Sequence, residues 1–410
     1  MCPNPSSDTT RRTLLSAAAV GVSALSGCLS LLPSSDPDTS LPDTPTGTWT
    51  QYGADGANTH ATDRNGPSKG NLAWTSDAFT RWQPTVADGT VFTTNFDPSH
   101  DGSAIAMDAQ SGTERWRTTL DASGDNGTVV VGDRCIVAYG TALVALDTET
   151  GERIWTASTN GFERVVADAA TGTVLVASDA GLEAFGAANG EQRWETDAMR
   201  NVFRAPAVYD DRVFVVGTVD GASSLVALSL ADGSNRWQHE LTTPPESAAP
   251  VTTGAGVIVA DDRTLVVHDR ETGERVRDLR SFGDPDPVAP RSVAVDDGTA
   301  FVTGSFGVAA VDTETGTERW RRDVSVDTLG VCLGADTVVT TVEDPEFAPG
   351  KKTISAFGRE SGERRWFYSF DPGFHHMVTS PPVLVGGAVF FTATHIDGLG
   401  ALGDAPARDR

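Results

Sequence analysis

The chain has 410 residues, of which 39% are hydrophobic and 21% charged, a composition typical of a globular protein with a large core. Acidic residues outnumber basic ones by 56 to 31, and Lys69, Lys351 and Lys352 are the only lysines. This excess of carboxylates weakens contact with phosphate backbones, which argues against nucleic acid as a partner.

The first 27 residues are predicted to be an export signal rather than part of the fold. Arg11 and Arg12 form a twin-arginine motif, and the apolar stretch at residues 17–25 is too short to span a bilayer as a stable helix. The sequence Leu-Ser-Gly-Cys at residues 25–28 resembles the lipobox of secreted lipoproteins. This resemblance implies cleavage before Cys28, a lipid on its sulfur, and anchoring at the outer face of the cell membrane. The alternative is a chance arginine pair and an unmodified thiol.

Residues 28–48 are predicted to form a tether. The prolines of this segment lie among Ser, Thr and Asp residues, at Pro33, Pro37, Pro42 and Pro45. Such a segment stays extended, and at about 3.1 Å per residue it would reach up to ~60 Å. The folded part is predicted to begin near Trp49 and to end near residue 405.

From residue 49 onward the sequence repeats about every forty residues. Each unit contains short β-branched runs without helical periodicity, then a turn with a glycine, and it closes four residues after that glycine. The glycines are Gly70, Gly112, Gly151, Gly190, Gly233, Gly273, Gly316 and Gly362. The closing residues are Trp74, Trp116, Trp155, Trp194, Trp237, Arg277, Trp320 and Trp366.

The turn before each glycine is expected to be a hairpin loop between two strands. In the pattern Asp-x-x-Thr-Gly, the Asp side chain accepts backbone N–H bonds and the glycine takes a positive φ. The Asp position is held by Asp108, Asp147, Asp269 and Asp312 and is replaced at Gly186, Ser229 and Gly358. The replaced turns must therefore be fixed by other contacts. The closing tryptophans are predicted to lie on the outermost strands and to fill the gaps between neighbouring units.

Units of this length and strand content predict an all-β fold, an eight-bladed β-propeller. The unit resembles the repeat of pyrroloquinoline-quinone enzymes and of their non-enzymatic relatives, which include the propeller lipoprotein of the outer-membrane β-barrel assembly machinery. The similarity runs from Trp49 to Leu402 and implies a quinoprotein-dehydrogenase-like propeller. The acidic composition also resembles that of secreted proteins of salt-loving archaea, in which salt screens the carboxylates.

The resemblance transfers a fold and not a chemistry. The quinone enzymes have an adjacent-cysteine disulfide, a calcium ion held by Glu and Asn side chains, a catalytic Asp and long inserted loops. This chain has no Cys-Cys pair, and unit spacings from 39 residues (Gly112 to Gly151) to 46 (Gly316 to Gly362) leave no room for such insertions. We therefore expect no enzyme activity, no catalytic residues and no cofactor, and the sequence gives no support for quinone binding.

Two other cysteines, Cys135 and Cys332, lie in apolar strand-like runs. They are expected to be buried free thiols, and a disulfide between them is the alternative.

The two ends of the repeat region complement each other. The last unit stops at residues 399–402 without a closing strand, whereas Asn71-Leu72-Ala73-Trp74 forms a closing strand with no unit before it. Pairing the two strands would satisfy the free edge of the last blade and close the ring. Trp74 is therefore predicted to lie beside residues 399–402.

A closed propeller presents a shallow mouth, ringed by the loops that lead into the innermost strands. Arginine, aromatic and histidine residues occur at these positions: Arg81, Trp82, Arg204, Arg291, His375 and His376. Arginine and aromatic side chains dominate protein-binding hot spots, so these residues form a candidate binding face. The alternative is that each pairs with a neighbouring carboxylate. No third ligand follows the two histidines, so no metal site is expected.

Two functions fit the sequence. The first is a monomeric protein-binding or assembly scaffold, held at the cell surface by its lipid, with an unidentified membrane or surface protein as partner. The second is a solute or quinone-cofactor binder that uses the mouth. A plugged channel would favour the scaffold, and a deep, polar, arginine-lined cavity would favour the binder.

Overall fold

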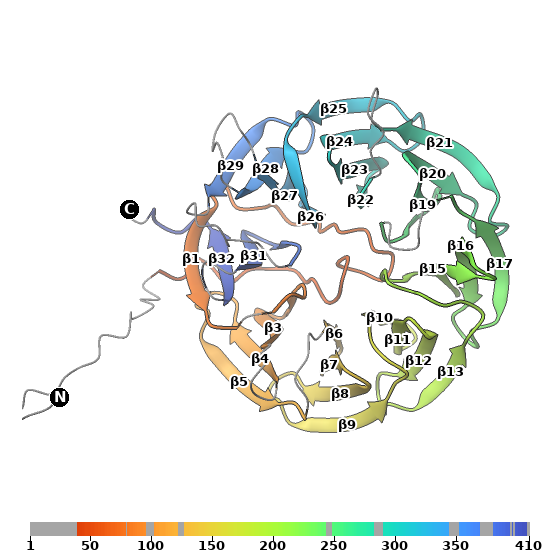
Figure 1. The fold of residues 1–410 in the computed structure, drawn as a ribbon. Helices are drawn as coiled ribbons and strands as arrows, with labels where there is room; N and C mark the ends of the chain where they lie inside the picture. Colours follow the sequence, from red (N-terminus) through yellow and green to blue (C-terminus); the bar gives the residue numbers. More distant parts are fainter. Residues whose placement is uncertain are drawn as a thin grey trace, which may run out of the picture. The chain divides into compact units, whose positions relative to one another are not determined.

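The architecture is a ring of β-sheets. A computed structural model describes residues 39–78, 80–95, 102–121, 127–242, 248–282, 290–343, 352–369, 380–393, 396 and 398–407. Every element among them is a β-strand, and the strands form eight four-stranded antiparallel sheets arranged around a centre (Figure 1). The protein is thus an all-β, eight-bladed propeller, as the forty-residue repeat predicts. Within these residues, no helix has the length and apolar content to cross a bilayer.

Blades 1 to 7 each consist of four consecutive strands, ordered from the centre outward. Blade 1 comprises β2 (Thr85–Ala87), β3 (Thr90–Asn95), β4 (Ser103–Asp108) and β5 (Glu114–Thr119); blade 2 comprises β6 (Gly127–Val131), β7 (Arg134–Tyr139), β8 (Ala142–Asp147) and β9 (Arg153–Ser158). Blade 3 comprises β10 (Arg164–Asp168), β11 (Thr173–Ser178), β12 (Gly181–Gly186) and β13 (Gln192–Thr196); blade 4 comprises β14 (Ala207–Tyr209), β15 (Arg212–Val219), β16 (Ala222–Ser229) and β17 (Asn235–Glu240). Blade 5 comprises β18 (Val251–Thr253), β19 (Gly256–Asp261), β20 (Thr264–His268) and β21 (Arg275–Ser281); blade 6 comprises β22 (Ser292–Asp296), β23 (Thr299–Gly304), β24 (Gly307–Asp312) and β25 (Glu318–Arg322). Blade 7 comprises β26 (Ser325–Leu333), β27 (Thr337–Glu343), β28 (Lys352–Gly358) and β29 (Arg364–Ser369).

Blade 8 joins the two ends of the repeat region. Its inner strands are β30 (Val383–Val385), β31 (Ala388–Ala393) and β32 (Gly398–Gly403), and its outermost strand is β1 (Asn71–Ser76). In the antiparallel pair of β1 with β32, Trp74 lies opposite Ala401 and Ser76 opposite Leu399. The predicted position of Trp74 beside residues 399–402 is confirmed. This pairing closes the ring without a covalent bond.

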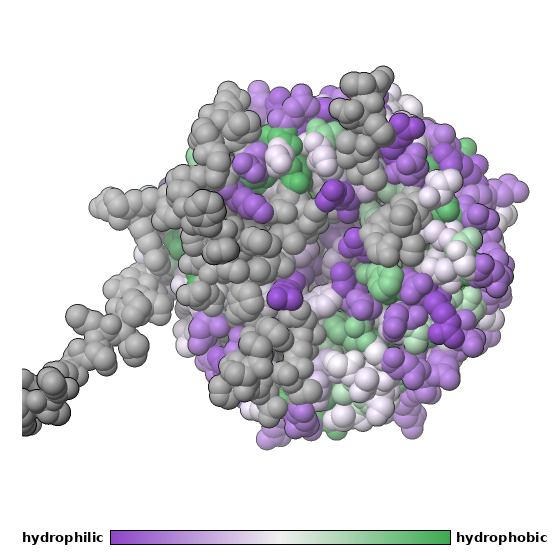
Figure 2. All heavy atoms as spheres, in the orientation of Figure 1, coloured by the Kyte–Doolittle hydropathy of each residue, from purple (hydrophilic) through white to green (hydrophobic). Residues whose placement is uncertain are grey.

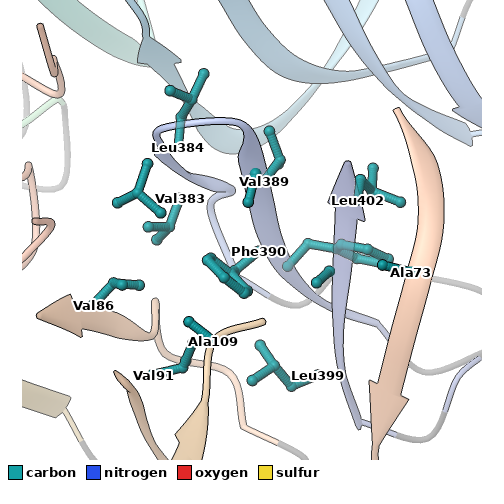
Figure 3. Packing of buried hydrophobic residues seen from close by; sticks show 14 of the residues in the cluster. Ala73, Val86, Val91, Ala109, Val383, Leu384, Val389, Phe390, Leu399 and Leu402 are labelled. Atoms are coloured by element: carbon teal, nitrogen blue, oxygen red, sulfur yellow. The ribbon is translucent and has the colours of Figure 1, made fainter. Parts of the chain in front are cut away.

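Apolar side chains pack around this closure. Figure 3 shows Val389 and Phe390 of β31 gathered with Val86 and Val91 of blade 1, and these residues belong to one buried cluster. Trp74 is fully buried in the same cluster, with its ring centroid 5.7 Å from that of Phe390. Full burial of each large apolar side chain contributes about 1.5–3 kcal/mol, so packing reinforces the strand pairing.

The turns between third and fourth strands show the predicted hairpin chemistry. Oδ1 of Asp147 accepts hydrogen bonds of 2.8–3.0 Å from the N–H groups of Glu149 and Thr150 and from the Thr150 hydroxyl. In the turns without the Asp, the residue three positions later, namely Asn189, Asp232 or Ser361, accepts from the backbone N–H two residues further on. Thr150 accepts the same bond from Glu152 in an Asp turn, so this contact is common to both kinds of turn.

The closing tryptophans reach from one blade to the next. The Trp74 Nε1 donates to the carbonyl O of Ala109 in blade 1 at 3.1 Å, and the ring covers Gly112, where a Cβ would lie 2.6 Å from an indole carbon. The same type of hydrogen bond joins Trp116 to Thr148, Trp155 to Ala187, Trp194 to Leu230, Trp237 to Arg270, Trp320 to Arg359 and Trp366 to Pro67. Between blades 5 and 6, Arg277 donates instead to the carbonyl oxygens of Thr313 and Glu314.

The folded part begins earlier than the sequence suggests. Thr39 Oγ1 donates to the carbonyl O of Ala73 at 2.8 Å, and the backbone N of Leu41 donates to the carbonyl O of Gln110 at 2.9 Å. Leu41 itself is buried. Contacts with the ring therefore begin ten residues before the predicted start near Trp49. They are single hydrogen bonds and not a strand ladder, so no periodic pattern in the sequence indicates them.

Candidate functional site

One segment of the chain runs through the centre of the ring. Residues 46–66, here called the crossing segment, pass the inner strands of the blades in order, and their trace crosses the middle of Figure 1. Going round the ring, the partners are Thr46 with Gly386 in blade 8, Trp49 with Val86 in blade 1, Thr50 with Val130 in blade 2, Gln51 with Ala167 in blade 3, Gly56 with Val208 in blade 4, Ala57 with Thr252 in blade 5, Thr59 with Val295 in blade 6 and His60 with Leu333 in blade 7. The backbone N–H of the blade residue donates in every pair. The crossing segment therefore touches all eight blades.

Several side chains of the crossing segment are buried in the centre of the ring. Trp49 and Asn58 are fully buried, and His60 is 2% exposed. Asn58 Nδ2 donates to the carbonyl oxygens of Ala205, Pro206 and Pro250, which belong to the approaches to blades 4 and 5. Burial lowers the pKa of His60 to about 4, so its imidazole is neutral at pH 7. The channel is occupied by the chain itself at this level.

The opposite end of the inner strands forms the mouth. Arg164 is the first residue of β10, and Ala167, which contacts the crossing segment, follows three residues later. At about 3.3 Å per residue, the two positions lie about 10 Å apart along the strand. Residues that lead into or begin inner strands thus lie on one side of the crossing segment, and the turns that leave these strands lie on the other.

Three residues meet at this mouth and are here called the mouth cluster: Trp82, Phe162 and Arg164. The rings of Trp82 and Phe162 have centroids 5.2 Å apart, and the Arg164 guanidinium carbon lies 4.5 Å from the Trp82 ring centroid. The first residue precedes β2 and the other two lie at the start of β10, so the cluster joins the approaches to blades 1 and 3. The indole Nε1 of Trp82 is buried and has no hydrogen-bond partner in the described part of the chain.

The charge of Arg164 is poorly compensated. Its Nη1 donates to the carbonyl O of Glu163 at 2.6 Å, but no carboxylate of the described residues forms an ion pair with it. Burial lowers the pKa of Arg164, and the nearby charge of Arg204 acts in the same direction, whereas Tyr52 and the Glu163 carboxylate oppose both from longer range. A guanidinium in this setting attracts any oxyanion that reaches it.

The structure places the six predicted face residues unevenly. Trp82 and Arg204 lie at or near the mouth cluster, whereas Arg81 and Arg291 are exposed residues in the approaches to blades 1 and 6. His375 and His376 fall outside the described residues. Sequence reasoning missed Phe162 and Arg164, although they satisfy the rule that selected the others, since both come just before or at the start of an inner strand.

The described surface offers few other sites. Figure 2 shows mainly hydrophilic residues on the coloured part of this face, with hydrophobic ones in small separate groups. The exposed large hydrophobic residues Ile154, Val276 and Phe367 lie on blades 2, 5 and 7. Since the coloured residues form no continuous apolar patch, docking on this part of the face would depend on charged and aromatic side chains.

A polar hollow of about 390 Å³ lies beside blade 3, and its lining includes Glu183, Glu195, Asp197 and Arg200. Glu183 is 4% exposed, and burial raises its pKa, but both its oxygens accept hydrogen bonds, from Asn160 N and Gln192 Nε2. No three His, Cys, Asp or Glu side chains in the described ranges are grouped so that they could hold a metal ion.

The two cysteines of the ring are buried and free. Burial raises the pKa of the Cys135 thiol to about 12, and it raises that of Cys332 as well. Neither thiol is therefore a nucleophile near neutral pH.

Comparison with known families agrees with this arrangement. A family profile described as outer membrane protein assembly factor BamB matches residues 60–183, 143–286 and 264–403. The chain belongs to this BamB family. The three overlapping matches extend from the crossing segment to blade 8, so the family assignment covers nearly the whole ring.

Solved structures show the same fold at low sequence identity. BamB from Moraxella catarrhalis is 19% identical with a TM-score of 0.54, and the match covers 69% of this chain and 87% of that one. Quinohemoprotein alcohol dehydrogenase from Comamonas testosteroni is 13% identical with a TM-score of 0.63, covering 88% and 82%. These likenesses establish the fold alone, because one propeller fold serves both assembly factors and dehydrogenases.

Two curated relatives share part of the repeat. The serine/threonine-protein kinases AfsK of Streptomyces coelicolor and Streptomyces griseus are 33% and 30% identical to this chain over 123 and 167 residues. The matches cover 28% and 37% of this chain but only 14% and 20% of the kinases. The chain thus spans a small part of the length of these relatives.

Proposed function

We propose that this protein is a cell-surface scaffold that binds another protein at the mouth of its propeller. The observation that supports this most directly is the crossing segment, because hydrogen bonds from every blade to residues 46–66 fill the channel with the protein's own chain. A channel occupied in this way favours recognition at the rim over chemistry inside. Membership of a family named after an assembly factor supports the same function.

We further propose that the scaffold is exported by the twin-arginine route and lipid-anchored through Cys28. The proposal rests on Arg11, Arg12 and the Leu-Ser-Gly-Cys motif. Because residue 39 is already held by Ala73, ten residues, 29–38, separate the anchor from the propeller, a distance of eleven residue-to-residue steps (39 minus 28). At about 3.1 Å per residue, the reach is roughly 35 Å, shorter than the ~60 Å expected from a tether to residue 48.

Replacing the anchor tests the localisation. Cys28→Ser should release a folded protein from the membrane into the medium, with thermal stability equal to that of the delipidated parent. The measurement is the distribution of protein between membrane and medium, with Cys135→Ser as the control for loss of a thiol elsewhere. If Cys28→Ser stays with the membrane, the lipoprotein proposal is wrong.

Affinity capture tests the scaffold. The anchored protein is cross-linked in its own membrane, purified and analysed by mass spectrometry, alongside Arg164→Gln and a peripheral control, Arg115→Gln. Arg115 lies far from the mouth and forms an ion pair with Asp108, in which Nη2 and Oδ2 are 2.8 Å apart. A partner retained by the parent and the control but lost with Arg164→Gln supports docking at the mouth. Recovery of the same partner from all three proteins would contradict it.

A second candidate function, binding of a small anionic solute or a quinone cofactor, is favoured by one observation. The mouth cluster presents an arginine stacked on an aromatic side chain in a partly buried setting. These groups suit a planar oxyanion as well as a peptide carboxylate. Binding measurements with defined probes separate the two functions.

A further inference from the structure

The starting observation is that Arg164 is partly buried at the mouth and has no carboxylate partner among the described residues. Acidic residues outnumber basic ones by 56 to 31, and many described arginines have carboxylate partners, as Arg115 has Asp108 and Arg319 has Asp312. Arg277 and Arg322 of the outer strands donate to backbone carbonyl oxygens instead. Arg164 has a backbone carbonyl and an indole face, with no carboxylate partner in the described ranges. In a protein with excess carboxylates, an arginine without one at the rim of a channel is a place for a carboxylate from outside.

The geometry specifies the kind of group that fits. Stacking on Trp82 holds the guanidinium in one plane, and Phe162 packs on the same indole. A guanidinium fixed in this way presents its remaining N–H groups edge-on, which matches the two oxygens of a carboxylate. Aromatic walls exclude water and strengthen a charge-assisted hydrogen bond.

The surroundings favour a protein segment over a free solute. The mouth cluster joins the approaches to blades 1 and 3, and the crossing segment fills the channel beyond it. A ligand held there therefore lies along the rim, which an extended segment can follow from one approach to the next. We propose that the mouth cluster binds a carboxylate, from an acidic side chain or the C-terminus of a partner segment, at the edge of the Arg164 guanidinium beside Trp82. This inference rests on the proposed function and names the partner's chemistry.

Isothermal titration with the purified full chain tests the site. The probes are a short peptide of Asp and Glu residues with a free C-terminus, its Asn and Gln analogue with an amidated C-terminus, and citrate. Buffers contain the lowest KCl concentration at which circular dichroism shows the folded spectrum, because salt screens such contacts. The proteins are the parent, Arg164→Gln, Arg164→Lys, Trp82→Phe and the control Arg115→Gln.

The acidic peptide should bind the parent and Arg115→Gln equally, and the amide analogue should not bind. Affinity should fall roughly tenfold or more in Arg164→Gln, since one partner of a charge-assisted contact is removed, and by less in Arg164→Lys, which keeps the charge without the planar fork. Trp82→Phe keeps an aromatic face and should lose affinity by a smaller factor. Circular dichroism of each variant verifies its fold, and Arg164→Lys supplies the result if Arg164→Gln does not fold.

Three outcomes would overturn the inference. One is the absence of peptide binding to the parent, the second is unchanged affinity in both Arg164 variants, and the third is citrate binding as tightly as the peptide, which would assign the cluster to a small solute. Because these titrations use defined probes, they succeed or fail independently of the affinity capture. If a partner is captured but the peptide does not bind, the proposed scaffold function stands and the proposed carboxylate site is wrong.

Discussion

Replacing Trp74 with alanine tests how the ring is closed. The indole is fully buried, packs on Phe390, donates a 3.1 Å hydrogen bond to Ala109 and covers Gly112. Large-to-small changes at a buried tryptophan cost about 3–5 kcal/mol, and the unpaired carbonyl adds to this. Trp155 has the same hydrogen bond to the next blade but is partly exposed, so Trp155→Ala should cost less, roughly 1–3 kcal/mol.

Guanidinium chloride unfolding, followed by circular dichroism, measures both changes in free energy of unfolding. Coincidence with a hydrodynamic probe verifies that the transition is two-state. Trp74→Phe keeps most of the packing and loses the N–H, so it separates the two contributions. A loss below about 1 kcal/mol for Trp74→Ala would contradict the conclusion that this tryptophan stabilises the contact between blades. An equal loss for Trp74→Ala and Trp155→Ala would contradict the expectation that the loss depends on burial.

Three further predictions concern stability. Gly112→Ala should be much more destabilising than Gly132→Ala in thermal denaturation. Both glycines have a positive φ, but a Cβ would meet the Trp74 indole at Gly112 and nothing within 4 Å at Gly132. Burial lowers the pKa of His60 from 6.5 to about 4 and also lowers that of His268. The unfolded chain therefore binds more protons than the folded one. The free energy of unfolding should fall as pH falls below about 6.5, by up to about 3 kcal/mol for His60. A free energy of unfolding that does not change between pH 7 and pH 4.5, or that changes equally in His60→Gln, would contradict this. Thermal stability should rise from dilute to molar salt as the acidic surface is screened. An unchanged melting temperature would contradict the resemblance to secreted proteins of salt-loving archaea.

The repeat could be predicted because one physical constraint recurs at seven of the eight blade junctions. Gly151 must take a positive φ beneath an indole, and Trp155 must span to the next blade, so both residue types appear at fixed spacing. The closing strand was predictable for the same reason, since Trp74 follows Gly70 by four residues and lacks a unit of its own. Local rules repeated often enough determine the global ring.

The crossing segment could not be predicted in this way. Its hydrogen bonds go to eight different blades, one or two at a time, so it has neither alternation nor helical periodicity. Residues such as Asn58 and His60 look like ordinary loop residues in the sequence, and only the assembled blades bury them. The mouth cluster depends similarly on tertiary structure, because Trp82 and Arg164 meet only when blades 1 and 3 are in place.

The position of the crossing segment and β1 has a consequence for how the chain acquires its structure. The crossing segment and β1 are synthesised before any blade, yet β1 pairs with β32. Leu72 can pair with Leu402 only after a further 330 residues (402 minus 72) have been synthesised. Contacts of such separation cost loop-closure entropy before they return any stability, and they slow folding. Blades can form one after another as they emerge, but the N-terminal segment remains without its partners until the last blade exists. Completion of the ring is therefore a late, whole-chain event, and a chain truncated anywhere before β32 is left with an unpaired edge at both ends.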